Sequence, residues 1–249
     1  MKHINVALFI PDEGCPHRCS FCNQKTISGF VKRPEEADVV SAYETALNSN
    51  KDVSGGEIAF FGGSFTAIEK GYMLSLLKTA KTYLDRGAFS GIRISTRPDC
   101  IDEDVLALLK KYGVTSIELG CQSMDDDVLF LNERGHTAAH CANSCRLIRD
   151  CGFELGVQMM TGLYGDTDEK ALQTAKKLIA LKPDTVRIYP TVVLKNTALE
   201  RLYNEGKYRA QTLEEAVNLC SRLLKMFNES GVMVIRLGLH SGGSVEEGY

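Results

Sequence analysis

Residues 92–120 have the sequence IRISTRPDCIDEDVLALLKKYGVTSIELG, and this stretch decides the fold. Two β-rich runs, at 92–96 and 116–120, flank a segment of helical period at 104–111. Asp102 precedes that segment and is suited to cap the start of a helix. A strand, a helix and a second strand in this order predict two parallel strands joined by a right-handed crossover.

The same alternation repeats along the rest of the chain. The sequence predicts strands at 5–10, 57–61, 92–96, 116–120, 154–160, 185–189 and 232–237, and helices at 35–48, 70–85, 104–111, 138–150, 169–181, 197–204 and 213–229. Six strand–helix units are too few for a closed eight-fold barrel. We therefore expect an α/β fold, a partial (β/α)6 TIM-like barrel with a parallel sheet and a possible extra C-terminal strand. A doubly wound sheet fits the same pattern, and in either architecture the sites lie at the carboxyl ends of the strands.

Nothing in the sequence divides the chain, which has no linker, low-complexity tract or internal repeat. We expect one core domain over residues 1–240. Residues 241–249 are polar and glycine-rich, and we expect them to form a tail or the start of a truncated segment.

Composition narrows the class of protein. The 249 residues are 44% hydrophobic and 24% charged, which is typical of a globular chain with a real core. A net charge of −3 argues against a protein held to nucleic acid mainly through phosphate contacts. The N-terminus lacks the pattern of a secretory signal, and no apolar run is long enough to span a membrane. We expect a cytoplasmic protein that does not contact a membrane.

Three of the nine cysteines crowd into one loop after the first predicted strand, and the other six are scattered. The loop contains Cys15, Cys19 and Cys22, and thiolates at this spacing can wrap around one soft-metal centre. A closed zinc site needs four ligands, and His17 or His3 could supply the fourth. A [4Fe–4S] cluster held by three cysteines instead leaves one iron open to a small molecule.

The spacing Cys-x3-Cys-x2-Cys, with Phe21 before the last cysteine, resembles the radical S-adenosylmethionine (SAM) superfamily. The resemblance implies a [4Fe–4S] cluster on Cys15, Cys19 and Cys22, with SAM chelating the open iron. It also implies reductive cleavage of SAM to methionine and a 5′-deoxyadenosyl radical, which abstracts hydrogen from a substrate that the sequence does not identify. A one-electron donor such as flavodoxin or ferredoxin, and sensitivity to oxygen, follow from the same chemistry.

Other motifs extend the resemblance to the SAM pocket. Gly62-Gly63-Ser64, after the second predicted strand, looks like the superfamily motif that holds the ammonium group of SAM. Arg134 matches the arginine that pairs with the SAM carboxylate. Phe21 is implied near the adenine. The resemblance also implies ribose contacts from Ser95, Gln122 and Gln158.

Over nearly its whole length the chain resembles the radical SAM domain of the Elongator catalytic subunit and, more loosely, the oxygen-independent coproporphyrinogen oxidases. The Elongator subunit continues into an acetyltransferase domain that this sequence lacks. Two alternatives stay open. One is an Elongator-like enzyme that modifies tRNA with a separate partner, and the other is a non-catalytic iron–sulfur or zinc protein.

Three weaker candidates complete the survey. Cys141 and Cys145 lie one turn apart on a predicted helix and could share a metal with Cys151. His136 could donate protons or touch substrate, although local packing explains it equally well. Lys195 could contact substrate from the sixth strand–helix loop, but a solvated loop lysine is the simpler interpretation.

Overall fold

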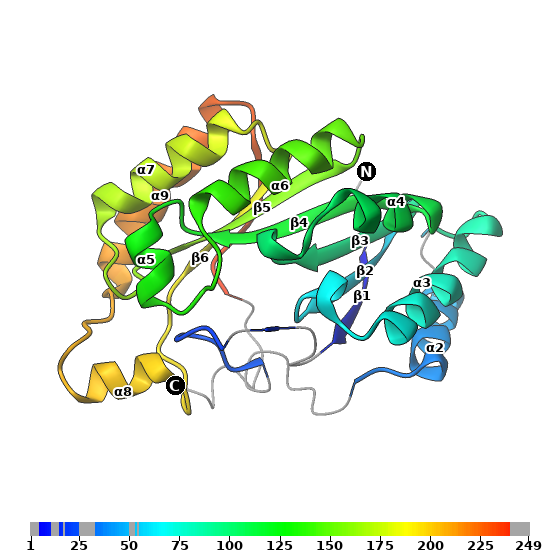
Figure 1. Ribbon diagram of the computed structural model, residues 1–249, viewed down its shortest axis with the longest axis horizontal. Helices are drawn as coiled ribbons and strands as arrows, with labels where there is room; N and C mark the ends of the chain where they lie inside the picture. The colour runs from blue at the N-terminus through cyan, green and yellow to red at the C-terminus, as the bar shows by residue number, and fades with distance from the viewer. Residues whose placement is uncertain are drawn as a thin grey trace.

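Seven parallel strands form one sheet that curls into a half-barrel (Figure 1). The structure, a computed structural model, describes residues 5–10, 15–16, 18–24, 33–49, 53 and 55–239. The strands are β1 (Asn5–Ile10), β2 (Glu57–Gly62), β3 (Gly91–Thr96), β4 (Val114–Gln122), β5 (Glu154–Thr161), β6 (Thr185–Pro190) and β7 (Met233–Leu237). They neighbour one another in sequential order. The predicted partial barrel is confirmed, with β7 as the extra strand, and the doubly wound alternative is wrong because it requires a reversal of strand order.

Most of the helices pack on the outer face of the sheet, and two short ones lie beyond the ends of its strands (Figure 1). The helices are α2 (Glu36–Asn48), α3 (Lys70–Asp85), α4 (Glu103–Lys111), α5 (Asp126–Leu131), α6 (Ala138–Asp150), α7 (Asp168–Ala180), α8 (Ala198–Asn204) and α9 (Leu213–Glu229), with short 3-10 turns η1 (Phe65–Ala67) and η2 (Pro98–Cys100). Asp102 caps α4 as predicted, with its carboxylate accepting from the amide of Val105. Capping at each helix start fixes where the preceding loop leaves the sheet.

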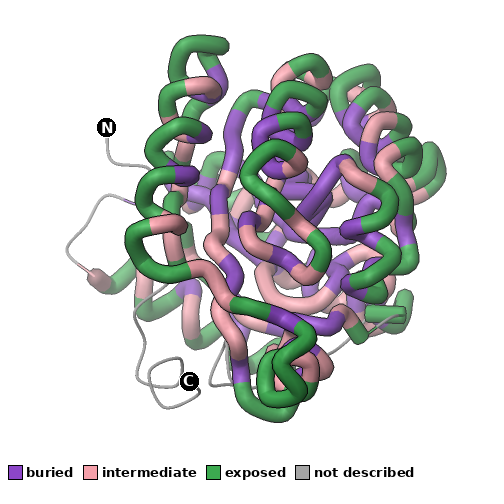
Figure 2. Tube along the Cα trace, turned by 90° about the vertical axis from the view of Figure 1, so that its left-hand side faces the viewer, coloured by how far each residue is buried: buried purple, intermediate pink, exposed green. Residues whose placement is uncertain are grey.

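The main apolar core lies between the sheet and these helices. Alternate strand residues such as Ile94, Leu119, Val157 and Ile188 are buried there. Figure 2 shows the buried residues concentrated on the strands, with the exposed ones on the outer turns of the helices. Because side chains alternate across a strand, the residues between them face the hollow of the barrel.

The hollow side of the sheet carries ion pairs as well as apolar groups such as Phe61, over whose ring the Arg187 guanidinium lies. Near the amino ends of the strands, Arg93 donates to Glu57 at 2.7 Å and to Glu154 at 2.9 Å. Glu118, one of the most deeply buried residues, accepts two hydrogen bonds from Arg187 at 2.6 and 2.9 Å. These paired charges brace the floor of the half-barrel across five strands, β2 to β6.

The predictions on membrane spans, on the C-terminal residues and on the alternative zinc ligands remain. No helix among the described residues is both long enough and apolar enough to cross a membrane. The predicted tail at 241–249 lies outside the described residues, as do the alternative zinc ligands His3 and His17.

Candidate SAM and cluster site

The cysteine loop lies at the carboxyl end of the sheet, held by a buried asparagine. Ser20, between two of the cysteines, donates from its amide to the Asn132 carbonyl at 3.1 Å and from its hydroxyl to Asn132 Oδ1 at 2.7 Å. The Asn132 amide group in turn donates to the carbonyls of Val128 and Tyr164. The amide of Leu199 donates to the Ser20 carbonyl at 2.8 Å. Ser20 is therefore bonded directly to two segments of the barrel rim, at Asn132 and at Leu199, and a third segment at Tyr164 holds Asn132 in place.

Each of the three cysteines contacts a different polar group. Cys15 Sγ lies 3.7 Å from the hydroxyl of Ser64. Cys19 Sγ accepts from Arg134 Nη1 at 3.0 Å, and Cys22 Sγ accepts from Gln24 Nε2 at 3.5 Å. The two predicted SAM-site groups Ser64 and Arg134 thus lie beside the predicted cluster ligands.

The donor set suits an iron–sulfur cluster. Burial, with added repulsion from the Cys19 and Cys15 thiolates, raises the pKa of Cys22 to about 12. Among the described residues, no three Cys, His, Asp or Glu side chains stand close enough together to hold a metal ion. To share one cluster as the sequence predicts, the three thiols would have to turn from their present partners, and Cys22 would have to lose its proton.

The strand-end glycines bring the backbones of β1 and β2 together. Gly62 has φ +110°, and a Cβ there would lie 2.5 Å from the carbonyl oxygen of Ile10. The amide of Gly63 donates to that same carbonyl at 2.9 Å. Ser64 follows in a buried position beside Cys15. The glycine motif predicted from the sequence therefore borders the cysteine loop.

Arg134 is buried at the carboxyl end of β4. Its Nη2 donates to the carbonyl of Gly120 at 2.6 Å, while Nη1 donates to Cys19. A Cβ on Gly120 would lie 3.5 Å from Arg134 Nη2 and 3.0 Å from Gln122 Nε2, so the glycine gives both side chains room. Gln122 itself has φ 62°, at a shift in the register between β4 and β5. Non-glycine residues held in this region carry strain that is common at ligand sites.

Five buried polar atoms around Arg134 have no protein partner. They are Ser95 Oγ, Arg97 Nη1, Gln122 Oε1, Arg134 Nε and His136 Nδ1, and all come from the ends of β3 and β4 and the segments that follow them. A buried polar atom without a hydrogen bond costs about 1–3 kcal/mol, so such a group marks a place for a polar ligand. Donors and acceptors are both present, as a zwitterion with a ribose requires. These residues fit SAM.

Two of the residues predicted to contact SAM lie in surroundings unlike those of the unpartnered atoms. Phe21 packs in a small apolar cluster with Leu163, Leu199 and Tyr208, so the predicted adenine contact involves a ring already seated against protein. Gln158 donates to Glu118 at 3.0 Å and belongs to the ionic network of the hollow. Both roles stay predictions.

His136 is buried and neutral. Burial and the charge of Arg134 lower the pKa of His136 to about 3. Its Nε2 lies 3.2 Å from the carbonyl of Cys121, so this nitrogen carries the proton and Nδ1 is an acceptor. An imidazolium at this position would not exist at neutral pH, which disfavours proton donation to a substrate.

The structure separates the three other cysteines from the site but places Lys195 next to it. Cys141 and Cys145 are fully buried in the core, where the Cys121 thiol contacts both. Cys151 ends α6 half-buried, so the proposed sharing of a metal by these residues is not supported. Lys195 is exposed, and its backbone carbonyl accepts from Asn23 at 2.9 Å, beside the cysteine loop.

Comparison with known proteins decides the family. The model of the radical SAM superfamily matches residues 9–178, and the model of the radical SAM C-terminal domain matches residues 183–245. The chain belongs to the radical SAM superfamily. It is an enzyme, and its cofactors are a [4Fe–4S] cluster and SAM.

Its similar proteins are Elongator-like. A tRNA uridine(34) acetyltransferase from Dehalococcoides mccartyi is 27% identical over 237 residues, covering 82% of this chain and 52% of that protein. Elongator complex protein 3 from Mus musculus is 33% identical over 139 residues, covering 55% of this chain and 25% of that protein. The solved Elp3 of Methanocaldococcus infernus superposes with a TM-score of 0.75 at 20% identity, covering 98% of this chain and 61% of that one. The radical SAM chain thus spans about half the length of the first of these relatives, and less of the mouse protein.

Sequence reasoning missed three residues that build this site. Arg97 follows β3 in the quoted run of 92–120, and an arginine just beyond a strand's carboxyl end was an available signal. Ser20 lies inside the cysteine loop, but nothing in one sequence pairs it with Asn132, 112 positions away.

Proposed function

We propose that this protein reductively cleaves SAM to generate a 5′-deoxyadenosyl radical that abstracts a hydrogen atom from a substrate bound at the mouth of the half-barrel. The observation that carries the proposal is the group of unpartnered polar atoms around Arg134, which itself contacts Cys19. Because Arg134 lies against the predicted cluster ligand Cys19, one small molecule could bind the cluster and the arginine at the same time.

Each residue has a defined task in this proposal. Cys15, Cys19 and Cys22 hold the cluster. The cluster supplies one electron to SAM, whose C5′–S bond breaks to leave methionine and the radical. Arg134 pairs with the SAM carboxylate through donors that its fork presents in one plane. The Gly62–Ser64 backbone accepts hydrogen bonds from the ammonium group of SAM, and Gln122 and Ser95 contact its ribose. The protein orients SAM and excludes water from the radical.

The donated electron comes from a small one-electron carrier such as flavodoxin or ferredoxin, and the reduced cluster makes the enzyme sensitive to oxygen. In this proposal residues 1–240 are the radical SAM core domain, and residues 241–249 are a tail or the start of a truncated segment.

The decisive experiment is anaerobic. The protein is purified without oxygen, reconstituted with iron and sulfide, reduced, and mixed with SAM, and 5′-deoxyadenosine is quantified. We expect product from the wild-type protein and none from Arg134→Ala at equal iron content. Zinc bound in place of iron, with no iron uptake on reconstitution, would contradict the proposal.

A second, finer candidate is favoured by the names of the relatives. An enzyme acting on tRNA uridine, with acetyl transfer supplied by a separate partner, fits their description. Binding of tRNA should then be measurable at low salt and weaken steeply as salt rises. Absence of binding at low salt would exclude this version and leave the radical chemistry intact. Membership of an enzyme family disfavours the non-catalytic alternative.

A further inference from the structure

Arg97 is a second buried arginine of the site, one residue beyond β3. Its side chain is only 4% exposed. Its Nε and Nη2 donate to the two carboxylate oxygens of Asp99 at 2.9 and 3.0 Å. Nη2 also donates to the backbone carbonyl of Arg134, and Nη1 has no protein partner. One guanidinium therefore joins a carboxylate, the Arg134 backbone and the unfilled polar space.

The carbonyl that Arg97 holds belongs to the turn between α5 and α6, where residues in the left-handed region stand on both sides of Arg134. Glu133, just before Arg134, has φ 54°, and Gly135, just after it, has φ 71°. A non-glycine residue in this left-handed region is strained, and its surroundings must offset that strain. The Arg134 amide donates to Leu129 on the other side of the turn. The bond from Arg97 fixes the second peptide plane, and with it the direction in which the Arg134 side chain leaves the backbone.

Charge arrangement allows the two guanidinium groups to lie together. Asp99 offsets the charge of Arg97 at close range, and its own pKa is lowered by the same ion pair, although burial opposes this. Arg134 has no carboxylate partner among the described residues and directs Nη1 to a cysteine. The cation left free to attract an anion is thus Arg134, while Arg97 is neutralised and serves geometry.

We propose that Arg97, held by Asp99, is the positioning residue that aims Arg134 at the SAM carboxylate and offers Nη1 as a further donor to the same ligand. The inference rests on the proposed function. It requires an arginine specifically, because a lysine cannot donate in a fixed plane to Asp99, to a carbonyl and to a ligand at once.

The test is SAM binding by the reconstituted protein with an intact cluster. Dissociation constants are measured by anaerobic equilibrium dialysis, and the electron paramagnetic resonance spectrum of the reduced cluster is recorded with and without SAM. We expect Arg97→Lys to keep its iron, to lose SAM affinity by about 10- to 100-fold, as for one or two lost bonds to a charged group, and to show a diminished spectral response to SAM.

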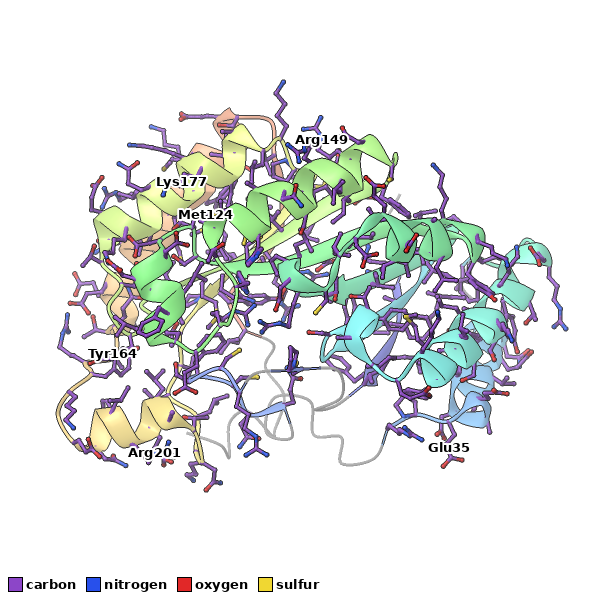
Figure 3. The ribbon with its side chains drawn as sticks, viewed as in Figure 1. Glu35, Met124, Arg149, Tyr164, Lys177 and Arg201 are labelled. Carbon is purple, nitrogen blue, oxygen red and sulfur yellow. The ribbon has the colours of Figure 1, made fainter. Side chains whose placement is uncertain are left out.

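A matched control is available on α6. Arg149 also holds backbone carbonyls, those of Leu181 and Lys182 at 3.0 Å, but it lies far from the cysteine loop (Figure 3). We expect Arg149→Lys to bind SAM as the wild type does. Asp99→Asn keeps the shape of the site while loosening Arg97, and should weaken SAM binding less than Arg97→Lys does. It serves as the second variant if Arg97→Lys unfolds.

A double variant distinguishes an Arg97 that acts through Arg134 from an Arg97 that only contacts SAM directly. If Arg97 acts through Arg134, Arg97→Lys in an Arg134→Lys background should cost clearly less affinity than in the wild type. Full additivity, or wild-type affinity in Arg97→Lys, would overturn the inference while leaving SAM binding by the wild type in place. Wild-type protein that loads its cluster but binds no SAM would overturn the proposed function, and this inference with it.

Discussion

Two arginines four residues apart, one within β3 and one just beyond its end, have different partners. Arg93, near the amino end of β3, donates to Glu57 and Glu154, and its remaining Nη1 lies 3.6 Å from Glu118. Arg97, at the carboxyl end, has one carboxylate partner and an Nη1 that faces no protein acceptor. The neighbouring Arg134 makes no ion pair with a carboxylate among the described residues. Burial alone does not distinguish them, since all three are under 7% exposed.

The difference lies in what surrounds each cation. At the amino end, Arg93 donates to two glutamates, and its Nη1, which makes no hydrogen bond, still lies 3.6 Å from a third. At the carboxyl end, donors and acceptors are left over on several side chains. Removing one partner from a buried ion pair destabilises the fold, because the other charge is left uncompensated, whereas a buried charge that lacks a protein partner points to a ligand. The half-barrel thus has an ion-paired floor towards the amino ends of its strands and a rim of unpartnered polar groups at their carboxyl ends. Variants at the floor should lose stability, and variants at the rim should lose ligand binding.

The largest expected effect is at the rim. Cys19→Ala should abolish the cluster, because two remaining thiolates cannot hold it, and iron content and the visible absorption of the reconstituted protein would show this. Cys151→Ala, at the end of α6, is the control and should load iron normally. Circular dichroism should show that both variants fold. Full iron content in Cys19→Ala would remove Cys19 from the ligands.

At the floor the expected loss is of stability rather than of ligand binding. Arg93→Gln leaves three glutamates without their central cation, and we expect a loss of about 3–5 kcal/mol in the free energy of unfolding. Urea unfolding measures it. The folded fraction should still bind SAM with wild-type affinity, and a weakened affinity there would break the distinction between floor and rim.

A smaller effect should depend on pH. The folded-state pKa of His136 lies at about 3, below its ordinary value of 6.5, because burial and Arg134 disfavour the charged ring. Below pH 6.5 the unfolded chain therefore binds a proton that the folded chain refuses, and stability falls by up to about 1.4 kcal/mol per pH unit until pH approaches 3. Unfolding of wild type and His136→Gln between pH 7 and pH 5 should show a shallower fall in the variant. Equal slopes would mean that His136 is accessible to water.

The smallest effect tests the anchoring of the cysteine loop. Ser20→Ala removes the hydroxyl bond to Asn132 but keeps both backbone bonds of residue 20. We expect a loss of about 1–3 kcal/mol, because Asn132 Oδ1 is left buried without its donor. Thermal unfolding measures the change. Slower iron uptake at unchanged final content would place the effect in the loop.

Much of this molecule could be predicted from its sequence because the fold repeats one local pattern. Each βα unit carries its own period and cap, as at Asp102, so the half-barrel follows from local signals. The cysteine spacing and the Gly62–Ser64 run predicted where the site lies, and the structure places Cys15 beside Ser64. The roles of the individual residues stay predictions.

What could not be predicted are pairings across the fold. The braced floor arises from charged residues at alternate positions of different strands, such as Arg93, Glu118 and Arg187. That period of two was visible, but which charge meets which depends on register. The bonds from Ser20 to Asn132 and from Arg97 to the Arg134 carbonyl depend on loops that meet only after the sheet has curled.

The anchoring of the cysteine loop also has a consequence for biosynthesis. The strands pair in the order of the chain, so the sheet can grow unit by unit as the polypeptide leaves the ribosome. The residues that secure the loop, however, are Asn132 and Leu199, which are translated long after Cys22. The cysteines therefore leave the ribosome early, and more than half of the protein must still be translated before the residues that hold their loop are present. Delivery of iron and sulfide to this chain should accordingly be a late event, completed after translation has passed α8.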